Sequence, residues 1–187
     1  MFIVLEGDNG TGKTTIARLI QNYGYSFVTE NETARAVETN AKHFAPGSPE
    51  RYNAFLAYNR LCGSLVSESK KTVLARYWIS TVSAAYADGL FDLSESLETA
   101  KILEKSMLKP DFIFRLSCCR SERLSRIEKR NSVEKTDDIS CERELKYTRI
   151  LDILESDISY MIDINTQNQS PESIVKQILS ITGDFSL

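Results

Sequence analysis

The sequence predicts an α/β fold of three layers, in which helices cover both faces of a five-stranded parallel sheet. Short apolar segments of strand length alternate along the 187 residues with longer segments whose apolar side chains recur at helical spacing. The strand segments are continuous apolar runs, which is typical of strands buried on both faces. Because no hairpin signal joins one strand to the next, we expect parallel strands connected through helices.

The strands are identified by compact apolar runs. The first run, Phe2-Ile3-Val4-Leu5, leads directly into Glu6-Gly7, and Phe112-Ile113-Phe114-Arg115-Leu116 follows shortly after Pro110. Each run has the length of an ordinary strand and is rich in β-branched or aromatic residues. In chain order, the strands are expected at residues 2–5, 25–29, 72–75, 112–116 and 160–164.

The helices are identified by apolar periodicity and by their end signals. Ser48 can cap a helix that follows Pro49, Ser170 is a good N-cap with Pro171 at the first helical position, and Pro110 requires a helix to stop before it. Residues 31–49 mix helix-like and loop-like pieces. The helices are expected at residues 14–21, 50–67, from about 79, 93–108, 120–130, 141–154 and from 171. With no repeat or linker, residues 1–187 are expected to form one domain.

The charge balance excludes two classes of protein. The chain has 23 basic and 26 acidic residues and a net charge of −3, whereas a protein that coats a nucleic-acid polymer or an anionic membrane needs a strongly basic face. The charge is nevertheless uneven along the chain. Residues 115–149 contain ten Lys or Arg and seven Asp or Glu, so this segment carries a net charge of +3.

The cysteines and the N-terminus give further expectations. The chain has four cysteines without a Cys-x-x-Cys pair and a single histidine, His43, so it has no zinc site of the usual spacing and its thiols are expected to be reduced. Adjacent Cys118 and Cys119 are expected on opposite faces of a strand end. The first residues lack the basic segment of a signal peptide and no apolar run approaches ~20 residues, so we expect a cytoplasmic protein that does not cross a membrane.

The most specific motif is Gly7-Asp8-Asn9-Gly10-Thr11-Gly12-Lys13-Thr14, which has the pattern G-x-x-x-x-G-K-[ST] between an expected strand and an expected helix. The glycines let successive backbone N–H groups point at one place, and the helix that follows adds the positive end of its dipole, so the loop forms a cradle for a polyphosphate. Lys13 is expected to reach the terminal phosphates, and the Thr14 hydroxyl is expected to bind Mg²⁺. The nucleotide-binding residues expected here are Gly7, Asp8, Asn9, Gly10, Thr11, Gly12, Lys13, Thr14 and Thr15.

The remaining motifs favour phosphoryl transfer over nucleotide hydrolysis. The chain lacks the N-K-x-D motif by which GTPases read guanine, and it lacks the apolar run closing in acids that is expected of a motor ATPase. It is rich in arginines, which neutralise phosphate charge during transfer. These arginines are Arg60, Arg76, Arg120, Arg123, Arg126 and Arg130.

Over nearly its whole length the chain resembles the thymidylate kinase family of nucleoside monophosphate kinases. The first strand and loop, Phe2 to Thr15, are similar to the family's opening segment, and Arg76-Tyr77 with Ser80 resembles its D-R-Y-x-x-S stretch. Shorter similarities follow the family's order at residues 55–60, 109–116, 122–130, 162–163 and 170–175.

This resemblance implies a P-loop kinase fold with a short helical lid at about residues 120–145, and transfer of phosphate from ATP, with Mg²⁺, to a deoxynucleoside monophosphate such as dTMP. Lys13 would hold ATP, Arg76 would bridge the donor and acceptor phosphates, and Arg126 and Arg130 would act from the lid. The residues expected to bind the acceptor are Phe55, Arg60, Arg76 and Tyr77, although Leu56 stands where the family usually has the stacking aromatic.

Three departures from the family concern acids and an arginine near the metal and the acceptor. Asn9 stands where the family's loop has an acid, with Asp8 beside it, and Ala75 replaces the acid of D-R-Y. The arginine of the family's R-E-P segment is missing, and Arg35 is the nearest candidate to replace it. Two alternatives therefore stay open: a kinase that phosphorylates a hydroxyl of a nucleoside or other small molecule, and a catalytically degenerate ATP-binding regulatory protein. A homodimer also stays open.

Overall fold

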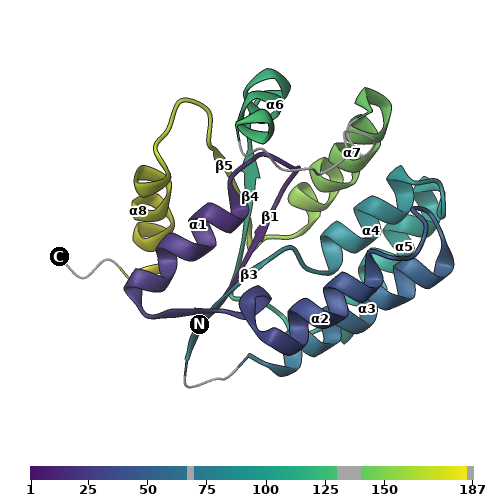
Figure 1. Cartoon of the computed structure of the whole chain (residues 1–187), viewed down its shortest axis with the longest axis horizontal. Helices are drawn as coiled ribbons and strands as arrows, with labels where there is room; N and C mark the ends of the chain where they lie inside the picture. The colour runs from purple at the N-terminus through teal and green to yellow at the C-terminus, as the bar shows by residue number, and fades with distance from the viewer. Residues whose placement is uncertain (67–69, 130–139, 185–187) are drawn as a thin grey trace.

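The computed structural model describes residues 1–66, 70–129 and 140–184, and within them five parallel strands form one sheet (Figure 1). The strand order is β2-β3-β1-β4-β5, with each neighbouring pair parallel. The prediction of a five-stranded parallel sheet is therefore confirmed. The strands are β1 (Phe2–Glu6), β2 (Tyr25–Phe27), β3 (Lys71–Ala75), β4 (Phe112–Ser117) and β5 (Met161–Asn165).

Helices cover both faces of this sheet, because side chains that alternate along each strand are apolar on both sides. In β1, Ile3 and Leu5 are buried in one core cluster with α1 and α8, whereas Phe2 and Val4 belong to a second cluster with α3, α4, α5 and α7. Figure 1 shows these two helical layers on opposite sides of the sheet. The helices are α1 (Lys13–Ile20), α2 (Glu32–Ala41), α3 (Pro49–Ser64), α4 (Trp78–Ala87), α5 (Leu93–Ser106), α6 (Arg120–Glu128), α7 (Cys141–Asp157) and α8 (Pro171–Thr182).

The largest difference from the predicted elements lies between β2 and α3. The second strand ends at Phe27 rather than at residue 29, because Val28–Glu30 turns into a short 3₁₀ helix. Residues 32–41 then form a full helix, α2, whose N-cap Asn31 accepts hydrogen bonds from the backbone N–H groups of Thr33 and Ala34. The sequence does not predict this helix as one element, because most of its residues are exposed and its apolar residues show little helical periodicity.

The carboxyl ends of all five strands meet at one edge of the sheet, because the strands are parallel. The loop after β1, Arg76 after β3, Cys118 after β4 and Thr166 after β5 therefore lie along the same edge, which is where open α/β sheets bind ligands. Of the predicted lid, α6 and the first turns of α7 rise beside this edge (Figure 1). Residues 130–139, with the predicted site residue Arg130, lie outside the described residues.

None of the helices formed by the described residues is long and apolar enough to cross a membrane.

Helix α5 provides a stability prediction remote from the strand ends. Its N-cap Asp92 accepts a hydrogen bond from the Glu95 backbone (2.8 Å), and the Glu95 carboxylate accepts one from the Asp92 backbone (2.8 Å). Replacing Asp92 with alanine is expected to lower the free energy of unfolding by about 1 kcal/mol. Urea denaturation measures this change. The exposed Glu98→Ala substitution on the same helix is the control, and an equal effect of both would show that the cap contributes nothing specific.

Candidate nucleotide-binding site

The loop between β1 and α1 is folded tightly against two neighbouring segments. Gly7 has a φ of 127°, and a Cβ at this position would overlap the backbone carbonyl of Leu116 in β4. Gly10 has a φ of 85°, and a Cβ there would lie 2.7 Å from the backbone oxygen of Arg123 in α6. Glycine is therefore required at both positions by conformation and by close packing. The motif G-x-x-x-x-G-K-[ST] thus has the strand–loop–helix setting that phosphate binding needs.

Lys13 is buried under this loop, where its ammonium group meets backbone carbonyls. Its Nζ donates to the Gly7 oxygen at 2.7 Å and to the Asp8 oxygen at 2.5 Å. Burial and the nearby Arg76 charge hold the pKa of Lys13 well below its ordinary value. A phosphate in the loop would supply a negative charge that favours the charged form of the lysine and so raises its pKa.

Arg76 lies across the loop from the end of β3. Its φ is 70°, an uncommon left-handed conformation for a residue other than glycine. The guanidinium donates to Asn9 Oδ1 (2.5 Å) in the loop and to the Tyr147 hydroxyl (2.9 Å) in α7, so one side chain joins β3, the loop and α7. Backbone strain of this kind is concentrated at functional sites.

Two further buried groups support Arg76. Ser80 Oγ lies 2.8 Å from the Tyr147 hydroxyl, and burial raises the pKa of Tyr147 to about 12, so this phenol stays protonated at neutral pH. Glu6 is fully buried and accepts hydrogen bonds from the Tyr77 backbone (2.8 Å) and the Ser80 hydroxyl. Burial raises the pKa of Glu6. Glu6 is thus held by its two oxygens at the start of the loop, whereas Ala75 leaves no carboxylate at the end of β3.

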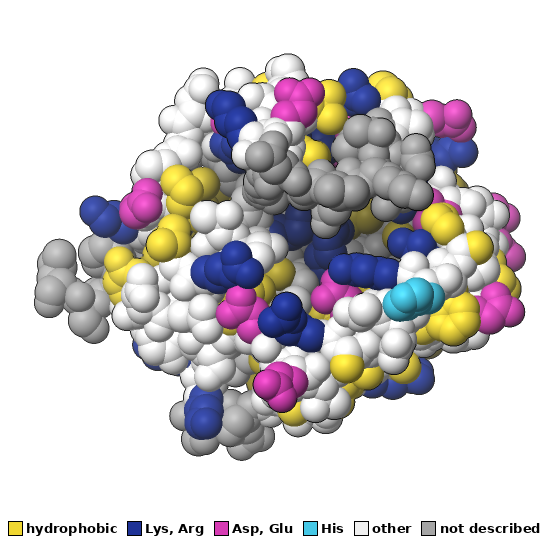
Figure 2. All heavy atoms as spheres, viewed as in Figure 1, with side chains coloured by type: hydrophobic (Ala, Val, Ile, Leu, Met, Phe, Trp, Pro, Cys, Tyr) yellow, Lys and Arg dark blue, Asp and Glu magenta, His cyan; other side chains and the backbone are white. Residues whose placement is uncertain are grey.

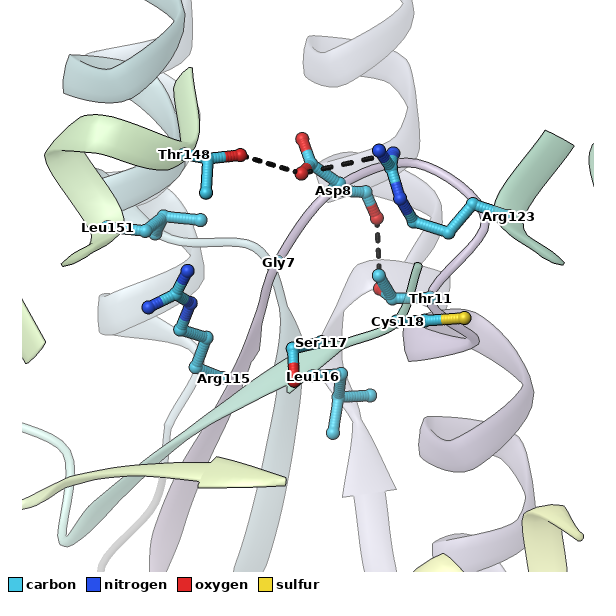
Figure 3. Close-up of a pocket in the computed structure, with 10 residues that line it drawn as sticks. All are labelled: Gly7, Asp8, Thr11, Arg115, Leu116, Ser117, Cys118, Arg123, Thr148 and Leu151. Atoms are coloured by element: carbon cyan, nitrogen blue, oxygen red, sulfur yellow. Dashed lines mark hydrogen bonds and ion pairs between the residues drawn. The ribbon is translucent and has the colours of Figure 1, made fainter. Parts of the chain in front are cut away.

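A second polar network joins the loop to α6 and α7 around a cavity of about 210 Å³ (Figure 3). The Asp8 carboxylate accepts a hydrogen bond from the Thr148 hydroxyl at 3.0 Å and lies 3.8 Å from Arg123. Arg123 is only 6% exposed, donates to the Asn9 backbone oxygen (3.2 Å) and pairs with Glu144 of α7 (3.2 Å). Figure 3 shows Asp8 and Arg123 above the cavity and Arg115 pointing toward it from β4. Helix α6 thus directs Arg123, one of the arginines singled out in the sequence, toward the loop.

Arg126 lies on the same helix but is directed to the end of β5. Its guanidinium donates to the Thr166 hydroxyl (3.1 Å) and the Thr166 backbone oxygen (2.8 Å), and it is paired with Glu122 one turn earlier. The predicted catalytic arginines Arg76 and Arg126 therefore belong to different contact networks in this structure.

The residues predicted to bind the acceptor do not gather at one place, unlike those of the loop. Phe55 is partly buried in α3, edge-on to Tyr58 at 6.5 Å between ring centroids. Arg60 is exposed on the same helix. The prediction that the Tyr77 side chain contacts substrate is wrong: it is 1% exposed and packs edge-on against Phe2 at 5.8 Å inside the core. A residue just after a strand can point either into a ligand pocket or into the core, and the Tyr77 ring points into the core.

Thr14 and Thr15 are exposed at the first turn of α1, whose N-terminus faces the loop. A threonine hydroxyl here matches the hard oxygen ligand that Mg²⁺ prefers, and the ion commonly keeps several waters beside substrate phosphates. Asp8 is the acid of the loop nearest in sequence, but its carboxylate is held by Thr148. Arg35, considered as a replacement for the missing family arginine, is exposed on α2.

Sequence reasoning missed Glu6, Tyr147, Thr148 and Glu144 as members of the site. Glu6 immediately precedes the loop, so its place beside a phosphate-binding motif was a usable signal. The three residues of α7 follow no motif and reach the loop only through the packing of that helix against the sheet edge.

The packing of α6 on the loop gives a prediction with a matched control. Gly10→Ala is expected to lower the free energy of unfolding by about 2–4 kcal/mol. The alanine would be strained in the left-handed backbone conformation of Gly10, and its Cβ would also overlap the backbone of Arg123. Gly12→Ala has the strain alone, since nothing lies within 4 Å of its Cβ position, and is expected to cost about 1–2 kcal/mol. Urea denaturation of both variants measures the difference. Equal costs would mean that α6 does not pack on the loop in solution.

No family model matches the chain. A probable thymidylate kinase of Thermococcus kodakarensis is 27% identical over 207 residues, covering 96% of this chain and 98% of that protein. Among solved structures, thymidylate kinase of Candida albicans has a TM-score of 0.71 at 14% identity, covering 99% of this chain and 93% of that chain.

Two further structures are similar. A deoxyadenosine kinase of M. mycoides with bound dCTP has a TM-score of 0.69 at 14% identity, covering 99% of this chain and all of the other. Thymidylate kinase of Ehrlichia chaffeensis has a TM-score of 0.66 at 17% identity, with 98% of each chain covered. These likenesses confirm the predicted resemblance to thymidylate kinases and the predicted P-loop kinase fold. Over nearly its whole length the chain is similar to thymidylate kinases, and it shares their P-loop kinase fold.

Proposed function

We propose that this protein transfers the γ-phosphoryl group of ATP to a deoxynucleoside monophosphate of the dTMP type, with Mg²⁺. The observation that carries this proposal is the position of Arg76, whose guanidinium lies against Asn9 of the loop that would hold the ATP phosphates. Phosphoryl transfer depends on positioning and charge neutralisation, and an arginine at this place can contact the donor and a phosphorylated acceptor together. The 27% identity to a probable thymidylate kinase supports the choice of a thymidylate-like acceptor.

In this mechanism the loop N–H groups and the N-terminus of α1 bind the β- and γ-phosphates, and Lys13 moves from the loop carbonyls to a phosphate oxygen. Thr14 would hold Mg²⁺, which neutralises phosphate charge when bound. Arg76 orients the acceptor phosphate toward the γ-phosphorus, and Arg126 reaches the donor phosphates from α6. Figure 2 supports an anionic ligand, since Lys and Arg side chains gather in and beside a hollow near the centre of that face.

The proposed organisation is one P-loop domain over residues 1–187, with a lid at about 120–145. Phe55 and Arg60 of α3 would contact the acceptor nucleotide, and Arg130 would act with Arg126. The cytoplasmic location and a homodimer remain predictions of the sequence.

A deoxynucleoside kinase is the second candidate, favoured by the likeness to deoxyadenosine kinase over the whole of both chains. Such an enzyme needs a base to take the hydroxyl proton, and Ala75 provides none at the end of β3. The two candidates therefore differ in whether the acceptor already carries a phosphate.

The test is ADP formation from ATP and Mg²⁺ with a panel of common nucleoside monophosphates and the matching unphosphorylated nucleosides. The proposal expects the fastest ADP formation with dTMP or a closely related monophosphate. Activity with nucleosides alone would favour the second candidate. ADP formation no faster than with ATP alone for every acceptor would refute both and favour a regulatory ATP-binding protein.

A further inference from the structure

Cys118, Cys119 and Glu122 form a compact cluster between the end of β4 and the first turn of α6. One ligand atom from each, the two sulfurs and a carboxylate oxygen, lie within 4.8 Å of one another. The sequence predicts the two adjacent thiols on opposite faces of a strand, and this prediction is wrong, because β4 ends at Ser117 and both cysteines follow it. Cys119 is the N-cap of α6, so its chain direction changes there and its sulfur can approach that of Cys118.

The position of Glu122 follows from the same helix start. It is the third residue of α6, and a side chain at that position reaches back over the N-cap. The sequence Cys-Cys-x-x-Glu therefore brings two sulfurs and one oxygen together locally, without the usual zinc-binding spacing. The thiols otherwise make weak contacts, Cys119 Sγ with Ser121 Oγ at 3.3 Å and Cys118 Sγ with the Cys119 backbone oxygen at 3.6 Å.

This set of donors suits a particular class of metal. Two thiolates select zinc-like ions over Mg²⁺ and Ca²⁺, which take oxygen ligands. A tetrahedral ion with Zn–S bonds of about 2.3 Å places its two sulfurs about 3.8 Å apart. The ligand atoms of the cluster lie within 4.8 Å of one another, so side-chain rotations that move the sulfurs by about 1 Å bring them into position. Cys119 is exposed and Cys118 is partly exposed, so an ion can reach the cluster and water can complete its coordination.

We propose that Cys118, Cys119 and Glu122 form a binding site for a thiophilic divalent cation of the zinc type. The site adjoins the nucleotide loop, because Cys118 lines the same cavity as Gly7, Asp8 and Thr11 (Figure 3).

Binding there also reaches Arg126, whose guanidinium is paired with Glu122. An ion that takes a Glu122 oxygen draws negative charge away from Arg126, so that Arg126 loses part of what holds it one turn along α6. This consequence rests on the proposed function, in which Arg126 contacts ATP. It predicts that one equivalent of Zn²⁺ slows ADP formation.

The test uses the reduced, metal-free full-length chain without nucleotide. Cd²⁺ is added while the ultraviolet band of cadmium–thiolate bonds is recorded, and Zn²⁺ affinity is measured by competition with a chromophoric chelator. We expect one ion per chain and a thiolate band. Cys118→Ser, Cys119→Ser and Glu122→Gln are each expected to weaken Zn²⁺ binding by about tenfold or more, whereas Cys141→Ser, which removes an exposed thiol at the start of α7, is the control.

Several results would overturn the site: no stoichiometric Zn²⁺ binding, a cadmium band that survives in Cys118→Ser and Cys119→Ser, or one that disappears in Cys141→Ser. Folding of each variant is checked by far-ultraviolet circular dichroism. Serine is a favourable N-cap residue, so a loss of metal binding in Cys119→Ser reports on the ligand rather than on a weakened helix start. Because this assay contains no nucleotide, a failure of the metal site is separate from a failure of the proposed kinase activity.

Discussion

Replacing Lys13 with alanine is expected to raise the Kd for ATP by about 100-fold, which corresponds to about 2.7 kcal/mol and is the size of a lost charged hydrogen bond. The stability of the fold is expected to change little. Lys13 makes its hydrogen bonds to loop carbonyls at the cost of burying a charge, as its lowered pKa reflects, and alanine removes both terms. Isothermal calorimetry with ATP and urea denaturation measure the two quantities.

The control for Lys13→Ala is Lys42→Ala, at the C-cap of α2. Lys42 is 56% exposed and pairs with Glu38 one turn away, so its removal takes one positive charge from the protein without touching the loop. ATP affinity is expected to be unchanged in this control. Equal affinity of Lys13→Ala and the wild type would remove the basis for a nucleotide site in the loop.

Replacing Arg76 with alanine is expected to lower kcat about 1,000-fold, with a much smaller effect on ATP affinity. Arginines that neutralise the transferring phosphoryl group contribute at least this factor in other enzymes, and they act mainly in the transition state. Arg76→Lys is expected to recover only part of the rate, because one ammonium group cannot replace the guanidinium bonds to both Asn9 and Tyr147. Steady-state kinetics with ATP and the best monophosphate acceptor measure kcat and KM.

Arg18→Ala is the matched control for Arg76→Ala. Arg18 is 64% exposed on α1 and pairs with Glu30, a surface ion pair of little energetic importance. A loss of rate equal to that of Arg76→Ala would mean that general charge, and not the position of Arg76, determines the effect. An Arg76→Ala enzyme with wild-type kcat would remove Arg76 from the mechanism.

The fold could be predicted almost fully from local patterns. The apolar run that forms β1 is buried on both faces of the sheet. Successive side chains of a strand point to opposite faces, so four apolar residues in a row, Phe2 to Leu5, predict a central strand covered on both sides. Proline and serine end signals place the starts of α3 and α8 at Pro49 and Pro171, as expected. The sequence does not predict α2 as a helix, because only Ala34 and Ala41 of its ten residues are buried and the segment therefore shows little apolar periodicity.

The site could be predicted only where one continuous motif defines it. The loop and Lys13 follow from sequence because neighbouring residues alone create that geometry. The sequence identifies Arg123 as one of several arginines but does not give its surroundings, because these form only when α7 and the loop pack on α6 and Glu144 of α7 pairs with Arg123. Tyr147 is 71 residues from its partner Arg76, and Thr148 is 140 residues from its partner Asp8. At such separations the spacing of residues in the sequence does not indicate that they are in contact.

The missing acids mark the central question for catalysis. Asn9 is the hydrogen-bond acceptor for Arg76, so a neutral amide at this position still holds the arginine against the loop. Ala75 leaves the end of β3 without a carboxylate, and the nearby buried acid Glu6 is engaged by Tyr77 and Ser80. In the proposed mechanism Thr14 and the phosphates would hold Mg²⁺ without a carboxylate at position 75, and this predicts a high Mg²⁺ requirement for activity.

The most direct measurement follows the transferred atom itself. ATP labelled with ³²P in the γ-phosphate is incubated with the protein, Mg²⁺ and dTMP, and the nucleotides are separated. Our account predicts label in the diphosphate of the acceptor, at a rate that depends on dTMP and falls about 1,000-fold in Arg76→Ala. Label that remains in ATP, or appears only as inorganic phosphate, would contradict it.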